Sequence, residues 1–379
     1  MSLVQKNPDE STTRATAAVR VGFVLFAALA LLSACRQAQL GSLSDSRIPL
    51  AVLGDSDSHA YQDTLSFPEG SGDRGGPYRA TALQWTEVLD RIRHRQVDQG
   101  AWGEWGTRGR WSRLAAWFGI DLRSPPKQDF QFNFAWSGAK CADLSEGHAR
   151  QTNRLLAVMD ETTARWRNGV VVIRIGINDL GHGAHLAEFA VESDSLRQRA
   201  RVDACLTQVR SAVDLISSRH PQVAFLLVGV LNNADTPTSI GRWKTLEERQ
   251  NIARVLDRYD AGLRLIASGS GRRAFFDDRA FFERNFGSRR ADGSSGYRGV
   301  DFGFAPDGTA MRSEFREGNA PTVLFLRDGH MGTSLNAIWA QAITETLKTE
   351  LGFEIEPISD DELKVVLSPL FIDAGKITE

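Results

Sequence analysis

The sequence predicts an α/β protein with a doubly wound parallel sheet, and two observations carry this prediction. Short apolar runs of strand length alternate along the chain with longer stretches in which apolar residues recur at helical spacing. Several of the apolar runs are rich in β-branched residues and end abruptly in Gly, Asn, Asp or Ser. Because strands that alternate with helices are joined by crossovers, they pair in parallel and carry helices on both faces of the sheet.

The predicted elements alternate from residue 48 onward. Strands are expected at residues 48–53, 130–135, 170–175, 223–230, 273–277 and 322–326. Helices are expected at residues 81–95, 150–167, 195–219, 246–267 and 336–351. Asn168-Gly169 and His220-Pro221 directly follow two of these helices and are typical helix stops. The hydrophobic content of 42% is ordinary and supplies a core for one domain, residues 47–351.

Four stretches break this alternation. Residues 66–77 are rich in Gly, Ser and Asp, which indicates a loop. Residues 101–119 are rich in Trp, and we expect these rings to fill or cover a core, with stacking on sugars as the alternative. Trp102 and Trp105 lie in a Gly-rich stretch that favours an exposed loop. Residues 286–321 have no periodicity and predict an inserted loop or lid. Residues 352–379 are expected to form a C-terminal appendage made of a helix and a strand.

The N-terminal residues read as a targeting segment and not as part of the fold. Arg14 and Arg20 precede the apolar run 21–32, which is too short to span a bilayer comfortably. The run ends in Leu-Ser-Ala-Cys, which resembles the lipobox of bacterial lipoproteins and implies cleavage of residues 1–34 and lipidation of Cys35. A plain membrane anchor or an ordinary secretory signal are the alternatives. With residues 35–46 as a tether, we expect a lipid-anchored protein of the cell envelope that faces the periplasm or the exterior.

The net charge and the cysteine content bear on the partners of the protein and on its disulfide bonds. The net charge of −2 argues against a nucleic-acid partner, which would favour a strongly basic chain. If Cys35 is lipidated, Cys141 and Cys205 remain. In an oxidising compartment these two either pair or stay as buried thiols, and the sequence leaves both possibilities open.

Four predicted strands end at residues that suit acyl transfer: Ser56, Gly138, Asn178 and His330. The carboxyl ends of parallel strands share one edge of a sheet, where a crevice binds ligands. Ser56 is a nucleophile that needs a base, and His330 can take its proton and return it to a leaving alcohol. The backbone N–H groups of Ser56 and Gly138, with the side-chain amide of Asn178, can bind an oxyanion.

These residues lie in blocks that resemble the four blocks of the SGNH (GDSL) hydrolase family. The blocks are Gly54-Asp55-Ser56, Gly138, Gly176-Ile177-Asn178-Asp179 and Asp328-Gly329-His330. The resemblance covers residues 48–351 and implies a three-layer α/β/α flavodoxin-like fold. It also implies ester hydrolysis or transacylation without metal or cofactor. By this likeness Ser56 is the nucleophile, Gly138 and Asn178 complete the oxyanion hole, and His330 is the base.

The chain departs from the family at the third catalytic residue. The family usually has Asp three residues before the histidine, where this chain has Arg327, and Asp328 lies two before it. That spacing also occurs in relatives that acetylate bacterial polysaccharides. Either Asp328 orients the imidazole of His330, which gives a triad, or a backbone carbonyl does so, which leaves a dyad.

Four further side chains invite a role. His59 is too close to Ser56 in sequence to reach it from the opposite side of a site. His182 and His185 are too few for a zinc site, so we expect them to line the mouth of the crevice or to be solvated. Arg174 lies inside a predicted central strand, where a charge needs a partner.

The sequence therefore predicts a serine ester hydrolase that deacylates an ester, carried by a carbohydrate or a lipid, through an acyl-enzyme on Ser56. Its partners would be that small-molecule, glycan or lipid ester and a membrane reached through the lipid anchor. Two alternatives stay open. One is an O-acyltransferase that acts on cell-envelope polysaccharide, and the other is a non-catalytic binding lipoprotein on the same fold.

Overall fold

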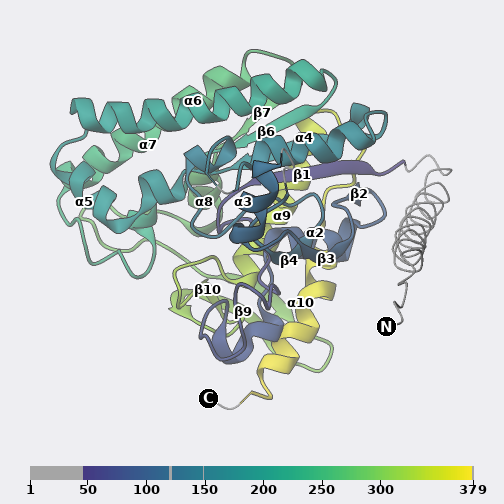
Figure 1. The fold of residues 1–379 in the computed structure, drawn as a ribbon. Helices are drawn as coiled ribbons and strands as arrows, with labels where there is room; N and C mark the ends of the chain where they lie inside the picture. The colour runs from purple at the N-terminus through teal and green to yellow at the C-terminus, as the bar shows by residue number, and fades with distance from the viewer. Residues whose placement is uncertain (1–45, 119–121, 148, 378–379) are drawn as a thin grey trace, which may run out of the picture. The chain divides into compact units, whose positions relative to one another are not determined.

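A five-stranded parallel sheet lies at the centre of the fold (Figure 1). The computed structural model describes residues 46–118, 122–147 and 149–377. The strands run in the order β2-β1-β5-β6-β7. Their bounds are Val97–Asp98, Ile48–Gly54, Val170–Arg174, Ala224–Val228 and Arg273–Phe276 in that order. This is the flavodoxin-like order, in which the switch point lies between β1 and β5. The predicted doubly wound α/β fold is confirmed.

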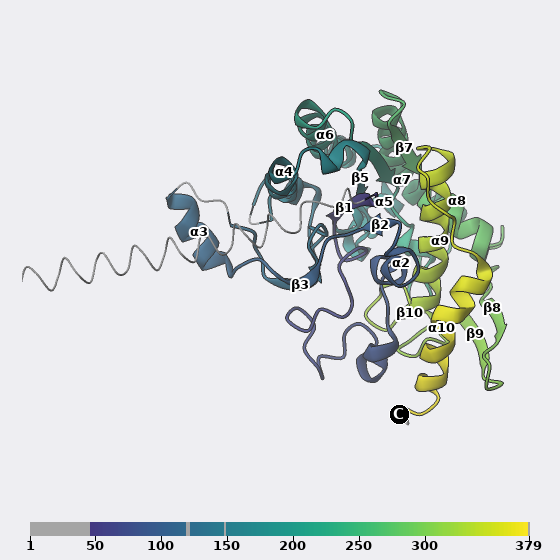
Figure 2. The same cartoon turned by 90° about the vertical axis from the view of Figure 1, so that its right-hand side faces the viewer.

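Helices cover both faces of the sheet, which makes three layers. Figure 2 shows α9 and α10 on one side and α4 and α6 on the other. Alternate residues of each strand enter two separate apolar clusters: Leu50, Val52 and Val172 in one, Ala51, Leu53 and Ile173 in the other. That division follows from the two-residue period of a strand buried on both faces. The helices are α2 Trp85–Arg93, α3 Gly109–Trp117, α4 Gln151–Glu161, α5 Gly183–Val191, α6 Leu196–Arg219, α7 Leu246–Ala267, α8 Asp278–Phe286, α9 Thr333–Thr349 and α10 Asp360–Ala374.

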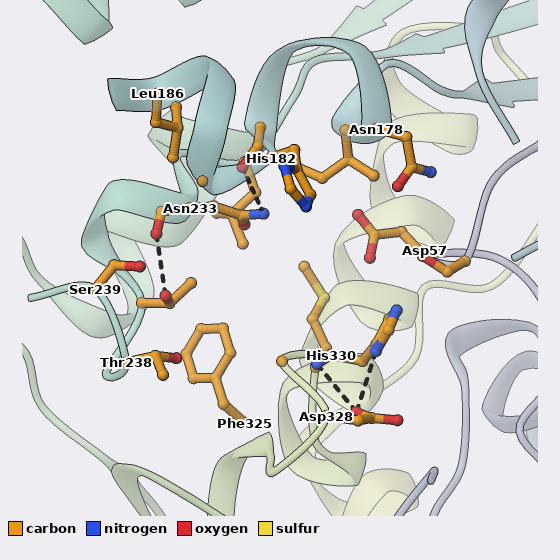
Figure 3. Close-up of a pocket in the computed structure, with 18 residues that line it drawn as sticks. Asp57, Asn178, His182, Leu186, Asn233, Thr238, Ser239, Phe325, Asp328 and His330 are labelled. Atoms are coloured by element: carbon orange, nitrogen blue, oxygen red, sulfur yellow. Dashed lines mark hydrogen bonds and ion pairs between the residues drawn. The ribbon is translucent and has the colours of Figure 1, made fainter. Parts of the chain in front are cut away.

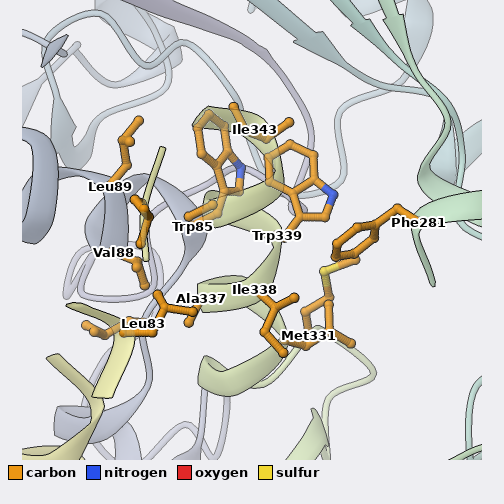
Figure 4. Packing of buried hydrophobic residues seen from close by; sticks show 14 of the residues in the cluster. Leu83, Trp85, Val88, Leu89, Phe281, Met331, Ala337, Ile338, Trp339 and Ile343 are labelled. Carbon is orange, nitrogen blue, oxygen red and sulfur yellow. The ribbon is translucent and has the colours of Figure 1, made fainter. Parts of the chain in front are cut away.

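Aromatic packing joins α2, α8 and α9 on the first face (Figure 4). The ring centroids of Trp85 and Trp339 lie 5.0 Å apart, and those of Phe276 and Trp339 lie 5.5 Å apart. Both tryptophans are fully buried, and each indole N–H donates to a buried oxygen, Trp85 to Ser58 and Trp339 to Asp278. Large rings with satisfied N–H groups make this face of the sheet a rigid base for the loops above it.

The predicted strand at residues 130–135 divides into two parts. Lys127–Phe130 forms β4, which pairs antiparallel with β3, Trp102–Trp105. The residues after β4 run beside β1 instead, with Phe134 N donating to Val52 O at 2.8 Å and Trp136 N to Gly54 O at 3.1 Å. Because β2 has only two residues, the rest of the β1 edge is open for this segment. The segment thereby brings Ser137 and Gly138 to the carboxyl end of β1.

Residues 286–321 are not an irregular loop, so that expectation is wrong. Val300–Phe304 forms β8 and Ala310–Gly318 forms β9, and both join β10, Val323–Leu326, in a separate three-stranded sheet. The strand expected at 322–326 therefore exists but lies outside the central sheet. In β9, Met311 and Ser313 are buried while Ala310, Arg312 and Glu314 are exposed. With so few apolar residues, the two-residue period of β9 does not stand out in the sequence.

The C-terminal residues are part of the core and not an appendage. Helix α10 contributes Leu363, Leu367 and Phe371 to the same apolar cluster as α9. Arg93 of α2 pairs with Glu362, with Nη1 2.6 Å from Oε1. The strand expected here does not occur among residues 352–377. Burial of an apolar helix face explains why this segment belongs to the domain.

Two further expectations concern the tryptophan-rich segment and the N-terminal segment. Trp111 and Trp117 are exposed by 53% and 83%, so packing in a core is wrong for them, whereas Trp102 is exposed by 44%, as expected of its Gly-rich stretch. Cys35 and the segments 1–34 and 35–45 lie outside the described residues. Within the part of the chain that is described, no helix combines the length and the apolar content that a bilayer crossing requires.

Candidate active site

A cavity of about 280 Å³ opens at the carboxyl edge of the sheet, at the switch point between β1 and β5. Ser56, Asn178, Asp328 and His330 all line it. In Figure 3, Asn178, Asp57 and His330 lie along one side, and Asn233, Thr238 and Ser239 lie on the opposite side. Four of the five residues predicted for the site from the sequence are therefore brought to one cavity.

Ser56 follows β1 in a turn whose backbone lies in close contact with the backbone of β5. A Cβ atom on Gly54 would lie 2.4 Å from the carbonyl oxygen of Arg174, so only glycine fits there. Beyond it, Asp55 N donates to that same carbonyl, and the Asp55 carboxylate accepts from Asp57 N at 3.1 Å. Ser56 is 7% exposed and lines the cavity. The turn thus presents the predicted nucleophile at the end of a buried strand.

Arg174 supports this turn and has the buried partner that its position requires. Its Nη2 lies 3.1 Å from Oδ2 of Asp278, the first residue of α8, and its Nη1 donates to Asp57 O at 2.8 Å. Its guanidinium carbon lies 4.3 Å from the centre of the Trp339 ring. A buried charge is tolerated when it is paired and hydrogen-bonded. Arg174 therefore links the turn after β1 to α8 and α9.

Asp328 and His330 form a pair within one tight turn after β10. Asp328 Oδ1 lies 3.1 Å from His330 Nδ1 and also accepts from His330 N at 3.3 Å. Gly329 between them has φ +84°, and its left-handed backbone makes the two-residue spacing possible. The Asp328 carboxylate thus lies beside Nδ1, as a triad would require, and the guanidinium of Arg74 lies 2.7 Å from the same nitrogen. Within the described residues, no hydrogen bond joins Ser56 to His330.

The Asp328 carboxylate is held in its charged form. Burial alone would raise the pKa of this carboxyl, but the hydrogen bond from His330 and the positive charge of Arg74 hold the pKa well below its usual range. The buried guanidinium of Arg74 lies against Oδ2, and Arg74 N donates to the same oxygen at 2.9 Å. The sequence analysis missed Arg74, because a single arginine in a Gly-rich loop carries no local signal.

Asn178 and the loop of Gly138 are tied together. Asn178 Nδ2 donates to Ala139 O at 2.9 Å, and the Asp179 carboxylate accepts from Cys141 N at 2.8 Å. Asn178 belongs to a single π-helical turn, η4 (Ile177–Gly181), directly after β5. Gly138 is exposed and does not line the cavity, although its loop lies beside the end of β1. Of the predicted site residues in the described chain, Gly138 is the one not brought to the cavity wall.

Cys141 and Cys205 form a disulfide, with their Cα atoms 5.0 Å apart. It joins the short 3₁₀ helix η2 (Cys141–Leu144) to α6 and so anchors the Gly138 loop. Among the described residues, these cysteines and Asp179 are the group whose ligand atoms lie within 4.8 Å of one another. In the disulfide the sulfurs are not thiolates, which are the form that binds metals.

The two histidines after Asn178 have different surroundings. His182 precedes α5, accepts from Ala184 N at its Nδ1 and lines the cavity, as expected. His185 is half-buried and lies away from the cavity lining, and burial lowers its pKa. Asp57 also lines the cavity beside Ser56, a position that the sequence analysis did not single out.

Comparisons with known proteins agree with this fold. A parallel sheet whose switch-point cavity holds Ser, Asn and an Asp–His pair defines a hydrolase of the α/β class. The sequence profile described as the GDSL-like Lipase/Acylhydrolase family matches residues 98–297, more than half of the chain. The chain belongs to this family, as the resemblance of its four blocks predicted. The matched residues include Gly138 and Asn178 but not Ser56, Asp328 or His330.

Two solved structures are similar to the chain. An extracellular lipase from Streptomyces rimosus is 17% identical, with a TM-score of 0.34, over 62% of this chain and 82% of the lipase. The lipase Lip_vut3 from a goat rumen metagenome is 12% identical, with a TM-score of 0.38, over 82% of this chain and 100% of the lipase. Comparison with curated proteins gives no match.

Proposed function

We propose that this hydrolase is a serine esterase that forms an acyl-enzyme on Ser56 and releases the acyl group to water. The observation that carries the proposal is the shared cavity of Ser56 and the Asp328–His330 pair. With Nδ1 of His330 bonded to Asp328, Nε2 is left as the nitrogen that can accept a proton from Ser56. This is the division of roles that a weakly reactive hydroxyl requires.

In the proposed reaction, His330 Nε2 takes the proton of the Ser56 hydroxyl as Oγ bonds to the carbonyl carbon of the ester. The oxyanion would accept from the backbone N–H group of Ser56 and from the side-chain amide of Asn178. Asn178 has two amide hydrogens, and its bond to Ala139 O uses one of them. The imidazolium then protonates the leaving alcohol as the C–O bond breaks. Water then attacks the acyl carbon while His330 takes its proton. His330 returns that proton to Ser56 Oγ as the bond to the acyl group breaks, which releases the carboxylic acid.

The lining of the cavity supports a neutral ester with a polar alcohol. The wall opposite His330 carries the hydroxyl and amide side chains of Thr238, Ser239 and Asn233, which can bond to hydroxyl groups of the substrate. Thr236 also lines the cavity. The Asp57 carboxylate beside Ser56 disfavours a phosphate or carboxylate on the leaving group, because like charges repel in a partly desolvated site. An O-acyl carbohydrate fits both features, and a lipid ester with a neutral head group is the alternative substrate.

An O-acyltransferase is the second candidate function, and the two-residue spacing of Asp328 and His330 is the feature that favours it. In that case a sugar hydroxyl replaces water as the acceptor. A non-catalytic binding lipoprotein is a weaker proposal, since a pure binder would need neither Ser56 nor the paired histidine. We further propose that Cys35 carries a lipid and holds the enzyme in the cell envelope.

Short-chain nitrophenyl esters, assayed with and without a sugar acceptor, test these proposals. We expect the wild type to release nitrophenol without an acceptor and Ser56→Ala to have no activity. Product release that requires the acceptor would favour the transferase. A fluorophosphonate adduct located by mass spectrometry should be on Ser56. An adduct on Ser58, or full activity of a folded Ser56→Ala, would overturn the assignment.

A further inference from the structure

We propose that Arg74 is a positioning residue for the Asp328–His330 pair, held in place by a buried hydrogen-bond chain from Asp63 through His59 and Ser137. This proposal rests on the proposed function, because the pair it positions is the proposed base. It also gives a role to His59, which the sequence analysis set aside as a base.

Arg74 projects from the loop between β1 and α2 into the interior, and its side chain is 4% exposed. The guanidinium carbon lies 4.2 Å from the centre of the Phe67 ring and 5.2 Å from that of Tyr61. The residue has φ +51°, a strained value for a side chain other than glycine. A buried cation at a strained backbone position is stable when interactions with its partners offset the cost of burial and strain. The partners of Arg74 therefore indicate its role.

The partners of Arg74 are the proposed catalytic pair. One nitrogen of the guanidinium, Nη1, donates to Asp328 Oδ2 and lies 2.7 Å from His330 Nδ1. With the Nδ1 proton directed at Asp328 Oδ1, Nη1 makes no hydrogen bond to Nδ1, and this approach places the positive charge of Arg74 beside the ring. Arg74 N also donates to Asp328 Oδ2 at 2.9 Å. Two donors on Oδ2 fix the plane of the carboxylate and leave Oδ1 for His330. Arg74 thereby compensates for the shortened spacing between aspartate and histidine.

The other guanidinium nitrogen ends a chain of buried polar groups. Nη2 donates to Ser137 Oγ at 3.2 Å, Ser137 Oγ lies 3.0 Å from His59 Nδ1, and His59 Nε2 lies 2.8 Å from Asp63 Oδ2. His59 and Asp63 have side chains with no exposure at all. Asp63 Oδ1 in turn accepts from the backbone of Leu65 and Gln128. The chain therefore begins at a carboxylate whose orientation is fixed by the backbone.

The direction of each hydrogen bond in the chain follows from chemistry. Burial would raise the pKa of Asp63, but hydrogen bonds lower it to about 2, so Asp63 is a carboxylate and His59 Nε2 carries the proton. Burial and the nearby Lys127 lower the pKa of His59 to about 4, which keeps the ring neutral. His59 Nδ1 is then an acceptor, and both the hydroxyl and the backbone N–H of Ser137 lie within hydrogen-bonding distance of it, at 3.0 and 3.2 Å. The Ser137 oxygen is left to accept from Arg74, and every link has a donor and an acceptor.

A catalytic triad can consist of the same residue types as Ser137, His59 and Asp63. Their surroundings, however, favour a role in holding Arg74 over a catalytic role. The guanidinium of Arg74 donates to Ser137 Oγ, and Ser137 does not line the cavity. Ser137 precedes Gly138, so the same chain of hydrogen bonds also fixes the Gly138 loop beside the end of β1. A nucleophilic Ser137 is therefore an outcome for the experiment to test.

The charge of Arg74 gives the proposal a measurable signature. The charged and titratable groups that face His330 are Asp328 in its own turn, Arg74 from the loop, and Asp57 and His182 in the cavity wall. A cation at Nδ1 disfavours the imidazolium. Removal of this cation while Asp328 remains should therefore move the acidic limb of the pH profile of kcat/KM to higher pH.

The test compares Arg74→Gln, Arg74→Lys and Ser137→Ala with the control Arg79→Gln. Arg79 lies near Arg74 in sequence, and its hydrogen bonds go to the backbone carbonyls of Phe67 and Tyr61, not to the catalytic pair. For Arg74→Gln we expect kcat to fall by about tenfold to a hundredfold with KM within about threefold of the wild type, since hydrogen bonds to a charged group are lost. Its acidic limb should rise by about one pH unit.

The remaining variants separate charge from geometry. Arg74→Lys keeps the charge but not the planar fork, so the acidic limb should return toward the wild-type pH while kcat stays low. Ser137→Ala should lower kcat by a smaller factor, leave the acidic limb in place and keep the fluorophosphonate adduct on Ser56. Arg79→Gln should leave the acidic limb in place whatever it does to the melting temperature.

Three results would overturn the positioning role: an acidic limb that does not move in a folded Arg74→Gln, a limb that moves equally in Arg79→Gln, or an adduct on Ser137. If Arg74→Gln does not fold, the Arg74→Lys and Ser137→Ala measurements decide, and wild-type kcat in both would refute the proposal. An inactive wild type, or an adduct on neither serine, would instead refute the proposed function, so the two failures are distinguishable.

Discussion

Replacement of Asp328 by Asn tests the proposed triad most directly, because every lone pair that this carboxylate uses faces a donor. Oδ1 accepts from His330 at Nδ1 and N, at 3.1 and 3.3 Å, and Oδ2 accepts from the backbone and guanidinium of Arg74. An asparagine has one oxygen and one NH₂ group, so in either orientation a donor faces donors.

Both orientations of the new amide damage the site. With NH₂ toward His330, the amide donates to Nδ1 and places the ring proton on Nε2, where the base should be free. With NH₂ toward Arg74, the buried guanidinium loses its counter-ion. We therefore expect kcat to fall on the order of a thousandfold or more, the size of loss that the wrong tautomer causes in a serine triad.

The assay is turnover of a nitrophenyl ester by Asp328→Asn and His330→Ala at one pH. Asp301→Asn is the matched control, because Asp301 Oδ1 accepts from Gly303 N in the same type of turn on the surface. A loss under about tenfold for Asp328→Asn, beside near-complete loss for His330→Ala, would mean a Ser56–His330 dyad and refute the triad.

The same change has a stability signature with a definite sign. The pKa of Asp328 is lower in the folded than in the unfolded state, so its stabilising contribution is full above the unfolded pKa and disappears as the pH falls through the folded pKa. Asp328→Asn should therefore unfold at lower denaturant concentration than the wild type near pH 7, and the difference should shrink in acid. An unchanged difference at pH 3 would contradict this.

Four further predictions follow from the described contacts and the N-terminal motif. Asn178→Ala should lower kcat by about a hundredfold to a thousandfold in the ester assay, as loss of one oxyanion donor does, with Ser56 still labelled by a fluorophosphonate. Reduction of the Cys141–Cys205 disulfide opens a loop with a sequence separation of 64 and should cost about 4 kcal/mol by the chain-entropy model. Denaturant unfolding with and without reductant measures that cost, and equal midpoints would refute it. His59 has a pKa of about 4 in the fold, so the wild type should lose stability as the pH falls from about 6.5 to about 4, and a folded His59→Gln should lose less. Cys35→Ser should abolish labelling by a palmitate analogue, and equal labelling of mutant and wild type would end the lipoprotein proposal.

The sequence by itself determined four of the five strands of the central sheet, all but β2, and most of the candidate site. β1, β5, β6 and α7 lie where apolar runs and helical spacing predict them, because burial on one or both faces leaves a local period in the sequence. The sequence predicts that Ser56, Asn178, Asp328 and His330 converge on one cavity, since the carboxyl ends of parallel strands share an edge of the sheet. Gly138 was the exception, because a lone glycine does not reveal which way its loop turns.

The tertiary structure alone decided the features that depend on distant parts of the chain. β10 leaves the central sheet because β9, a strand with few apolar residues, pairs with it. Helix α10 joins the core because α2 and α9 leave an apolar surface for it. Arg74 meets His330 across 256 residues of sequence, and His59 meets Ser137 across 78. A buried polar group leaves no period in the sequence, because its stabilisation comes from partners that only the folded chain brings within hydrogen-bonding distance.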